Sequence, residues 1–149
     1  MLYKLANTLR RLYWWIRRPI TIGARAIVTD GKSVLLVKHS YLKDWYLPGG
    51  GVGRGETLQD VVRRELKEEV GFVYDGALNL LATHSNFGEY KNDHIVLFEV
   101  KTSVFEPKGG GEVKEAKFFA FDHLPVDISP ATKRRIEEYL KMKPREEMW

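Results

Sequence analysis

Three glutamates, Glu65, Glu68 and Glu69, lie close together in the segment GGVGRGETLQDVVRRELKEEVGF, which covers residues 50–72. On a helix that turns about 100° per residue, they fall within or at the edge of the sector occupied by its apolar residues. Carboxylates crowded there repel one another and lose hydration, so a cation must compensate their charge. Oxygen ligands suit Mg²⁺ or Mn²⁺, and the segment therefore predicts a divalent metal site.

The stretch before this helix has more glycines than an ordinary connector. Residues 47–53 read LPGGGVG, and glycine lets a backbone bend tightly and approach a ligand closely. Thr57 and Asp60 have the spacing of a helix-capping box, and Gly71 stands where a helix commonly ends. We therefore expect a loop that presents backbone groups beside the carboxylates. A solvated glutamate-rich helix would explain the number of charges but neither their placement nor the glycines.

The spacing of these residues resembles the Nudix box without a departure. Gly50 is followed after five residues by Glu56, and after seven more by the run RELKEEVGF at residues 64–72. The resemblance implies hydrolysis of a diphosphate linkage in a nucleoside diphosphate derivative, with Mg²⁺ or Mn²⁺ bound by the box. The implied substrates are a nucleoside triphosphate, a dinucleoside polyphosphate or a nucleotide sugar.

The resemblance also implies a role for each matching side chain. Glu65 and Glu69 are expected to bind the metal directly. Glu68 is expected to be a further ligand or the residue that prepares the attacking water. Arg64 and Glu56 are expected to form a supporting ion pair that orients the catalytic carboxylates. Metal ions would neutralise phosphate oxygens and make bound water more acidic, so that attack on phosphorus becomes feasible near neutral pH.

Two further metal ligands are expected outside the helix. The resemblance places the backbone carbonyl of Gly49 among the ligands. Many Nudix enzymes have another carboxylate beyond the box, as a metal ligand or base, at no fixed spacing. Glu112 and Glu115 follow residues 107–111, which we predict to be a mobile loop. Glu112 is the preferred candidate and Glu115 the alternative; the remaining interpretation is that both are surface residues.

Residues outside the box select the substrate, and the sequence specifies them less well. Lys38 and His39 end a predicted strand that leads towards the glycines, and Arg25 lies on another strand, so each is a candidate for phosphate contact. The alternatives are a salt bridge and, for the histidine, a surface position. Tyr90 lies 18 residues beyond Phe72. This spacing resembles that of the tyrosine that stacks on a base in Nudix hydrolases of dinucleoside polyphosphates.

Length and composition predict one small domain. The chain has 149 residues, 44% of them hydrophobic, which is enough for one core and too short for two domains. It has no cysteine, which excludes disulfides and thiolate metal sites, and no secretory signal, so we expect a cytoplasmic protein. A net charge of +4 favours polyanions in general. Without a recognised binding motif, we do not expect nucleic acid as a partner.

The first 18 residues predict an amphipathic helix, because apolar side chains recur at intervals of three and four residues. Pro19 should end it. Its aromatic rings and arginines are typical of a helix that makes peripheral contact with a membrane, here at the inner face. The alternative, which we favour, is that the helix packs on the domain or on a second copy of the chain in a homodimer.

The rest of the chain predicts strands interspersed with helices. A β-hairpin is expected at Asp30-Gly31. Later strands are expected near residues 77–84, 94–101 and 116–121, and a last helix near residues 129–140. This order resembles the Nudix fold, an α/β/α sandwich around a mixed β-sheet. The fold class is therefore α/β, with an added N-terminal amphipathic helix.

The expected domain organisation has three parts. An N-terminal helix covers residues 1–19, a Nudix hydrolase domain covers 20–142, and a C-terminal tail covers 143–149, loose from Pro144 onwards. Two functions are compatible with this organisation. One is a metal-dependent diphosphate hydrolase, and the other is a non-catalytic Nudix domain that senses a nucleotide or binds a partner. The complete set of carboxylates favours the enzyme, because a sensor can lose its catalytic acids.

Overall fold

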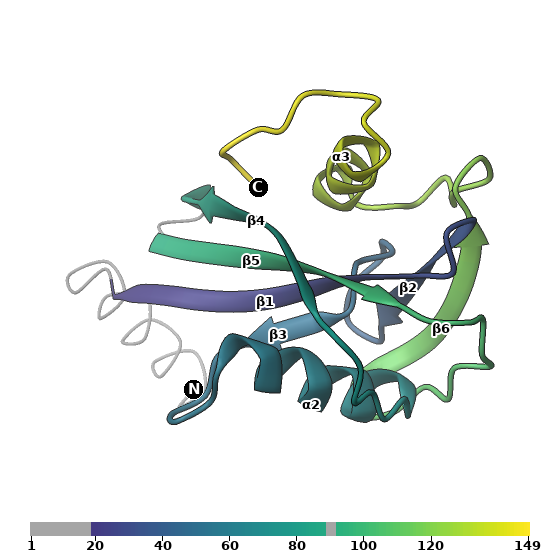
Figure 1. The fold of residues 1–149 in the computed structure, drawn as a ribbon, viewed down its shortest axis with the longest axis horizontal. Coiled ribbons are helices and arrows are strands. Elements are labelled where there is room, and N and C mark those ends of the chain that lie inside the picture. The colour runs from purple at the N-terminus through teal and green to yellow at the C-terminus, as the bar shows by residue number, and fades with distance from the viewer. Residues whose placement is uncertain (1–18, 89–91) are drawn as a thin grey trace, which may run out of the picture.

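The computed structural model describes residues 19–88 and 92–149, which form a six-stranded mixed sheet with a helix on each face (Figure 1). The strands are β1 (Ile20–Thr29), β2 (Ser33–His39), β3 (Gly49–Gly51), β4 (Asn79–Asn86), β5 (Asn92–Lys101) and β6 (Val113–Ala120), and the helices are α2 (Leu58–Val70) and α3 (Pro130–Tyr139). The expected α/β/α sandwich is confirmed. The helix expected over residues 1–18, and Tyr90, lie outside the described residues.

The sheet has the order β4-β5-β1-β2-β6, with β3 beside β1. β1 runs parallel to β5, while the other pairs are antiparallel. The predicted hairpin joins β1 to β2. At its turn Asp30 Oδ1 accepts from the backbone N–H groups of Lys32 and Ser33 at 3.0 and 2.7 Å. Gly31 has a φ of 92°, which side chains disfavour.

The glycines at the start of the box form a strand, where the sequence predicted only a loop. Gly49–Gly51 pairs with β1 as strand β3. β1 and β2 are in register at Thr29 and Val34 near their turn. Farther along, Tyr46 pairs with Val37 of β2 while the glycines pair with β1. The prediction failed because successive glycines provide no side-chain alternation from which a strand could be read.

Helix α2 begins and ends as predicted. Thr57 accepts from the backbone N–H of Asp60, which completes the capping box by accepting from the Thr57 backbone N–H. Gly71 ends the helix in the left-handed conformation, with a φ of 67°. The apolar face of α2 packs on one side of the sheet, and α3 packs on the other. No helix in residues 19–88 and 92–149 is long and apolar enough to cross a membrane.

The C-terminal tail is docked on the domain, so the expectation that it is loose was wrong (Figure 1). The Ser85 N–H in β4 donates to the Glu147 carbonyl at 2.8 Å, and the Trp149 N–H donates back to Ser85 at 2.9 Å. Arg135 of α3, whose side chain is fully buried, donates to the Met148 carbonyl at 2.7 Å. The sequence did not reveal this docking because it depends on contacts with distant segments, including a buried arginine.

Candidate active site

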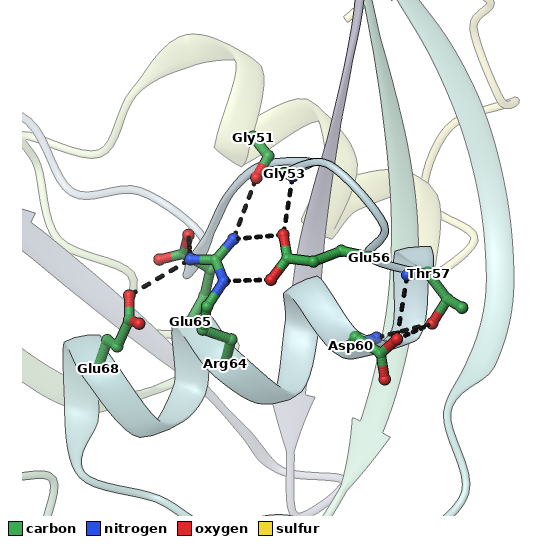
Figure 2. Close-up of polar contacts among 8 residues, drawn as sticks. All are labelled: Gly51, Gly53, Glu56, Thr57, Asp60, Arg64, Glu65 and Glu68. Carbon is green, nitrogen blue, oxygen red and sulfur yellow. Dashed lines mark hydrogen bonds and ion pairs between the residues drawn. The ribbon is translucent and has the colours of Figure 1, made fainter.

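Arg64 connects three of the box glutamates (Figure 2). Its Nε and Nη2 atoms donate to the two oxygens of Glu56 at 2.6 and 3.1 Å, which is a bidentate ion pair. Its Nη1 atom donates to Glu65 at 2.6 Å and to Glu68 at 3.3 Å. Nη2 also donates to the Gly51 carbonyl at 3.1 Å, which ties the network to β3. The guanidinium lowers the pKa of Glu56, so this carboxylate stays ionised.

Glu69 is the most buried of the box glutamates, with 7% of its surface exposed. Burial raises its pKa to about 7, although a 3.0 Å hydrogen bond from the Gly49 N–H and the charge of Arg25 act in the opposite direction. Glu65 is also largely buried, whereas the Glu68 side chain is 58% exposed. The apolar sector predicted from the sequence therefore contains Glu69 and Glu65, and Glu68 lies at its solvent-facing edge.

The donor types at this site fit a divalent cation. Three carboxylates on one helix supply the oxygen ligands that Mg²⁺ and Mn²⁺ prefer. A Cβ at Gly50 would lie 2.2 Å from Glu65 Oε1, so β3 leaves the space that this carboxylate occupies. Within the described parts of the chain, no three acidic or histidine side chains are gathered into a metal-binding cluster. The contacts from Arg64 and the Gly49 amide hold the carboxylates instead.

Arg25 and His39, two of the predicted phosphate contacts, lie near Glu69. The Nε2 atom of His39 is 3.6 Å from Glu69 Oε1, and burial lowers the pKa of this histidine. Arg25 donates from Nη1 to the Leu47 carbonyl at 2.9 Å. Its positive charge lowers the pKa of both Glu69 and His39. The structure therefore brings both residues to the carboxylates, although His39 is largely buried.

Lys38, the third predicted phosphate contact, is not brought to this site. Its Nζ atom forms an ion pair with Asp127 at 2.6 Å and lies 5.6 Å from the centre of the Trp45 ring. Trp45 belongs to the core on the α3 side of the sheet, opposite α2. Because side chains alternate along a strand, Lys38 and His39 point to opposite faces. The salt bridge that the sequence left open as the alternative is the arrangement found.

The two glutamates beyond the box are placed differently. Burial lowers the pKa of His39, and the nearby charge of Glu112 opposes this shift, so the Glu112 carboxylate lies on the side of the box carboxylates. Glu115 is in register with Lys38 and shares its face. The preceding loop, which was predicted to be mobile, bonds to the end of α2 through the Gly110 N–H and the Glu69 carbonyl at 3.1 Å.

Tyr41 also lies at this site, and sequence reasoning missed it. Its ring stacks on His39 with a centroid separation of 5.4 Å. An aromatic residue two positions beyond a candidate phosphate contact was the available signal. Tyr90, the aromatic residue that the sequence suggested instead, is among the residues that the structure does not describe.

Comparison with known proteins identifies the family. The NUDIX domain model matches residues 19–140. An ADP-ribose pyrophosphatase from Methanocaldococcus jannaschii is 29% identical over 127 residues, which cover 82% of this chain and 74% of that protein. An RNA pyrophosphohydrolase from Ruthia magnifica is 41% identical over 49 residues, which cover 33% and 27%. The crystal structure of a MutT NUDIX hydrolase from Burkholderia pseudomallei matches with a TM-score of 0.70 and 25% identity, covering 80% of this chain and 97% of that one.

The chain therefore belongs to the Nudix family. It is a Nudix pyrophosphohydrolase, an enzyme that acts on phosphorus-containing anhydrides. The resemblance found in the box is thereby confirmed over most of the chain. The family generally uses divalent metals, in agreement with the donor types described above.

Two neighbouring glycines of β3 provide a matched test of the close approach to Glu65. Gly50→Ala should lower catalytic activity by about 10²-fold, because the added Cβ displaces a carboxylate that must be accurately placed. Gly51→Ala should change activity by less than about 2-fold, because a Cβ there meets no atom within 4 Å. Steady-state kinetics with thermal unfolding as the folding control measures both variants. Equal losses in the two would contradict a specific role for the missing Cβ of Gly50.

The raised pKa of Glu69 makes the stability of the metal-free protein depend on pH. The folded state holds this proton more tightly than the unfolded chain, whose value is near 4.5. The contribution to the free energy of unfolding should therefore decline as pH rises from about 5 to about 8, by about 3 kcal/mol at most. Burial lowers the pKa of His39 and His84, so their contribution to the free energy of unfolding increases with pH. The effect of Glu69 must therefore be measured as the difference between the natural chain and a Glu69 variant.

The measurement is urea unfolding in chelator at several pH values, for the natural chain and for Glu69→Gln. Glu69→Gln removes the titrating group. Its free energy of unfolding should therefore increase relative to that of the natural chain as pH rises towards about 8. Saturating Mg²⁺ should reduce that advantage by stabilising only the natural carboxylate. A stability difference between the two proteins that does not change with pH would show that Glu69 is not buried in this way.

Proposed function

We propose that this protein is a Mg²⁺- or Mn²⁺-dependent hydrolase of the diphosphate linkage in nucleoside diphosphate derivatives. The observation that carries the proposal is the set of Glu65, Glu68 and Glu69 on one helix. Arg64 holds Glu65 and Glu68, and the Gly49 N–H of β3 holds Glu69. The similarity to an ADP-ribose pyrophosphatase supports a nucleotide joined to a sugar as the first substrate to test. Nucleoside triphosphates and dinucleoside polyphosphates are the other candidates.

Glu65, Glu69 and the Gly49 carbonyl would hold the cation, with Glu112 as a further candidate ligand. A bound divalent cation neutralises phosphate oxygens and makes water more acidic. Arg64 keeps Glu65 in position through the 2.6 Å contact and is itself fixed by its bidentate pair with Glu56. The chain thus sets the carboxylates in place before the substrate arrives, which limits the reorganisation needed for reaction.

Glu68 is the carboxylate that we assign to proton transfer, because it is the most exposed of the three and can meet water. In the proposed reaction a water oxygen forms a bond to one phosphorus atom, and its proton passes to Glu68. The bond from that phosphorus to the bridging oxygen breaks, and the bridging oxygen leaves with the electron pair on the other phosphate. Arg25 supplies positive charge on the same side for a phosphate group.

The test is a substrate panel with product identification by mass spectrometry. ADP-ribose, nucleoside triphosphates and dinucleoside polyphosphates would each be incubated with Mg²⁺ or Mn²⁺, and again with chelator. We expect AMP and ribose 5-phosphate from ADP-ribose, and no turnover in chelator. Cleavage of no member with either metal would overturn the proposal, and tight nucleotide binding without cleavage would instead favour the sensor function.

The role of residues 1–18, which lie outside the described residues, stays a prediction from the sequence. Membrane contact predicts that the full chain floats with liposomes of anionic lipid, whereas a version that begins at Ile20 stays in the soluble fraction. Identical behaviour of the two proteins would reject membrane contact. Size-exclusion chromatography of the same pair tests the alternative, in which this segment supports a homodimer.

A further inference from the structure

Tyr41 is a large aromatic residue left exposed beside the box carboxylates. It is 64% exposed and lies in the turn that follows β2. Its ring stacks on His39 with centroids 5.4 Å apart and an angle of 30° between the planes. His39 in turn places Nε2 3.6 Å from Glu69 Oε1. A single side chain therefore separates Tyr41 from the most buried of the proposed metal ligands.

The turn that carries Tyr41 is fixed to its surroundings. The Ser40 N–H donates to the Glu112 carbonyl at 2.9 Å, and the Leu42 N–H donates to the His39 carbonyl at 3.2 Å. These backbone bonds and the contact with His39 hold the ring in place before a ligand arrives. Such preorganisation reduces the entropy lost on binding.

We propose that the exposed face of Tyr41 stacks on the nucleobase of the substrate, while the diphosphate lies at Glu65 and Glu69. The inference rests on the proposed function, because it assigns the end of the same site that binds the base. The ring offers a planar apolar surface on which a base can stack. Stacking on a planar face does not read base edges, so the proposed subsite tolerates different bases.

AMP and ribose 5-phosphate provide a matched pair of probes, because they differ only by the adenine base. Calorimetry with Mg²⁺ would measure the dissociation constants of both for the full chain and its variants. Tyr41→Ala should weaken AMP binding about 10-fold and change ribose 5-phosphate binding less than about 2-fold. Tyr41→Phe and Tyr41→Trp should keep AMP binding, because both retain an aromatic face. Leu42→Ala, in the same turn, is the control and should alter neither ligand.

Several results would overturn the stacking role. These are unchanged AMP binding in Tyr41→Ala, absence of AMP binding by the natural chain, or equal losses in Tyr41→Ala and Tyr41→Phe, which would assign the effect to the hydroxyl. A parallel loss of both ligands would show a general disturbance of the turn and would also overturn it. The two proposals fail separately: selective AMP binding through Tyr41 without any diphosphate cleavage would contradict the proposed function alone.

Discussion

Replacing Glu69 with glutamine should lower kcat/KM by about 10²- to 10³-fold on the substrate identified by the panel. The variant keeps the size of the side chain but removes the charge that we assign to metal binding. In the natural chain Glu69 Oε2 accepts from the Gly49 N–H at 3.0 Å, and the amide oxygen of glutamine can accept the same hydrogen bond. Folding should therefore persist, and the metal-free variant should be at least as stable as the natural chain near pH 8.

Glu115→Gln is the matched control for this experiment. It makes the same change of acid to amide, but Glu115 pairs in register with Lys38 on the other face of the sheet. Its activity should stay within about 2-fold of the natural value. Steady-state kinetics across Mg²⁺ concentrations would compare the variants. Near-natural turnover by Glu69→Gln at low Mg²⁺ would remove this glutamate from the metal site.

Replacing Arg135 with alanine should lower the free energy of unfolding by about 3–5 kcal/mol, because it leaves a buried acid without its partner. The Arg135 side chain is 0% exposed, and its Nη2 atom lies 2.8 Å from Glu138, which is itself 6% exposed. Nη1 reaches the Met148 carbonyl at 2.7 Å and His84 Nδ1 at 2.8 Å.

Urea unfolding would measure the loss, with Arg134→Ala as the control on the same helix. The Arg134 side chain is 35% exposed and donates to the Trp149 backbone at 2.7 Å, so its removal should cost about 1 kcal/mol or less. Adding Glu138→Leu to Arg135→Met should recover part of the lost stability, because no buried charge then lacks a partner. Equal stabilities of the two alanine variants would show that the buried arginine contributes no more stability than its partly exposed neighbour.

Local rules predicted the parts of the fold that depend on neighbouring residues. Thr57, Asp60 and Gly71 specify the ends of α2, because caps act within one helical turn. The turn at Asp30-Gly31 specifies the hairpin in the same way. Helical periodicity predicted that acids would lie within or at the edge of the apolar side of α2, which the burial of Glu69 confirms.

The features that were missed depend on contacts between distant segments. β3 is held by pairing with β1, and the tail is held by Arg135 and β4, so neither has a local pattern. Lys38 and His39 are adjacent in sequence, yet strand alternation sends them to opposite faces, and only the packed core shows which face has the acids. Tyr41 reaches the site through the turn after β2, whose path depends on contact with Glu112.

Binding of Mn²⁺ by the metal-free protein, measured by calorimetry with and without AMP, is the most direct test of the central claim. We predict that the natural chain takes up the ion and that a Glu65→Gln/Glu69→Gln variant binds it at least about 10²-fold more weakly. Both proteins should remain folded by circular dichroism. Failure of the folded natural chain to take up the ion under either condition, or equal uptake by the double variant, would contradict the assignment of these carboxylates to a catalytic metal site.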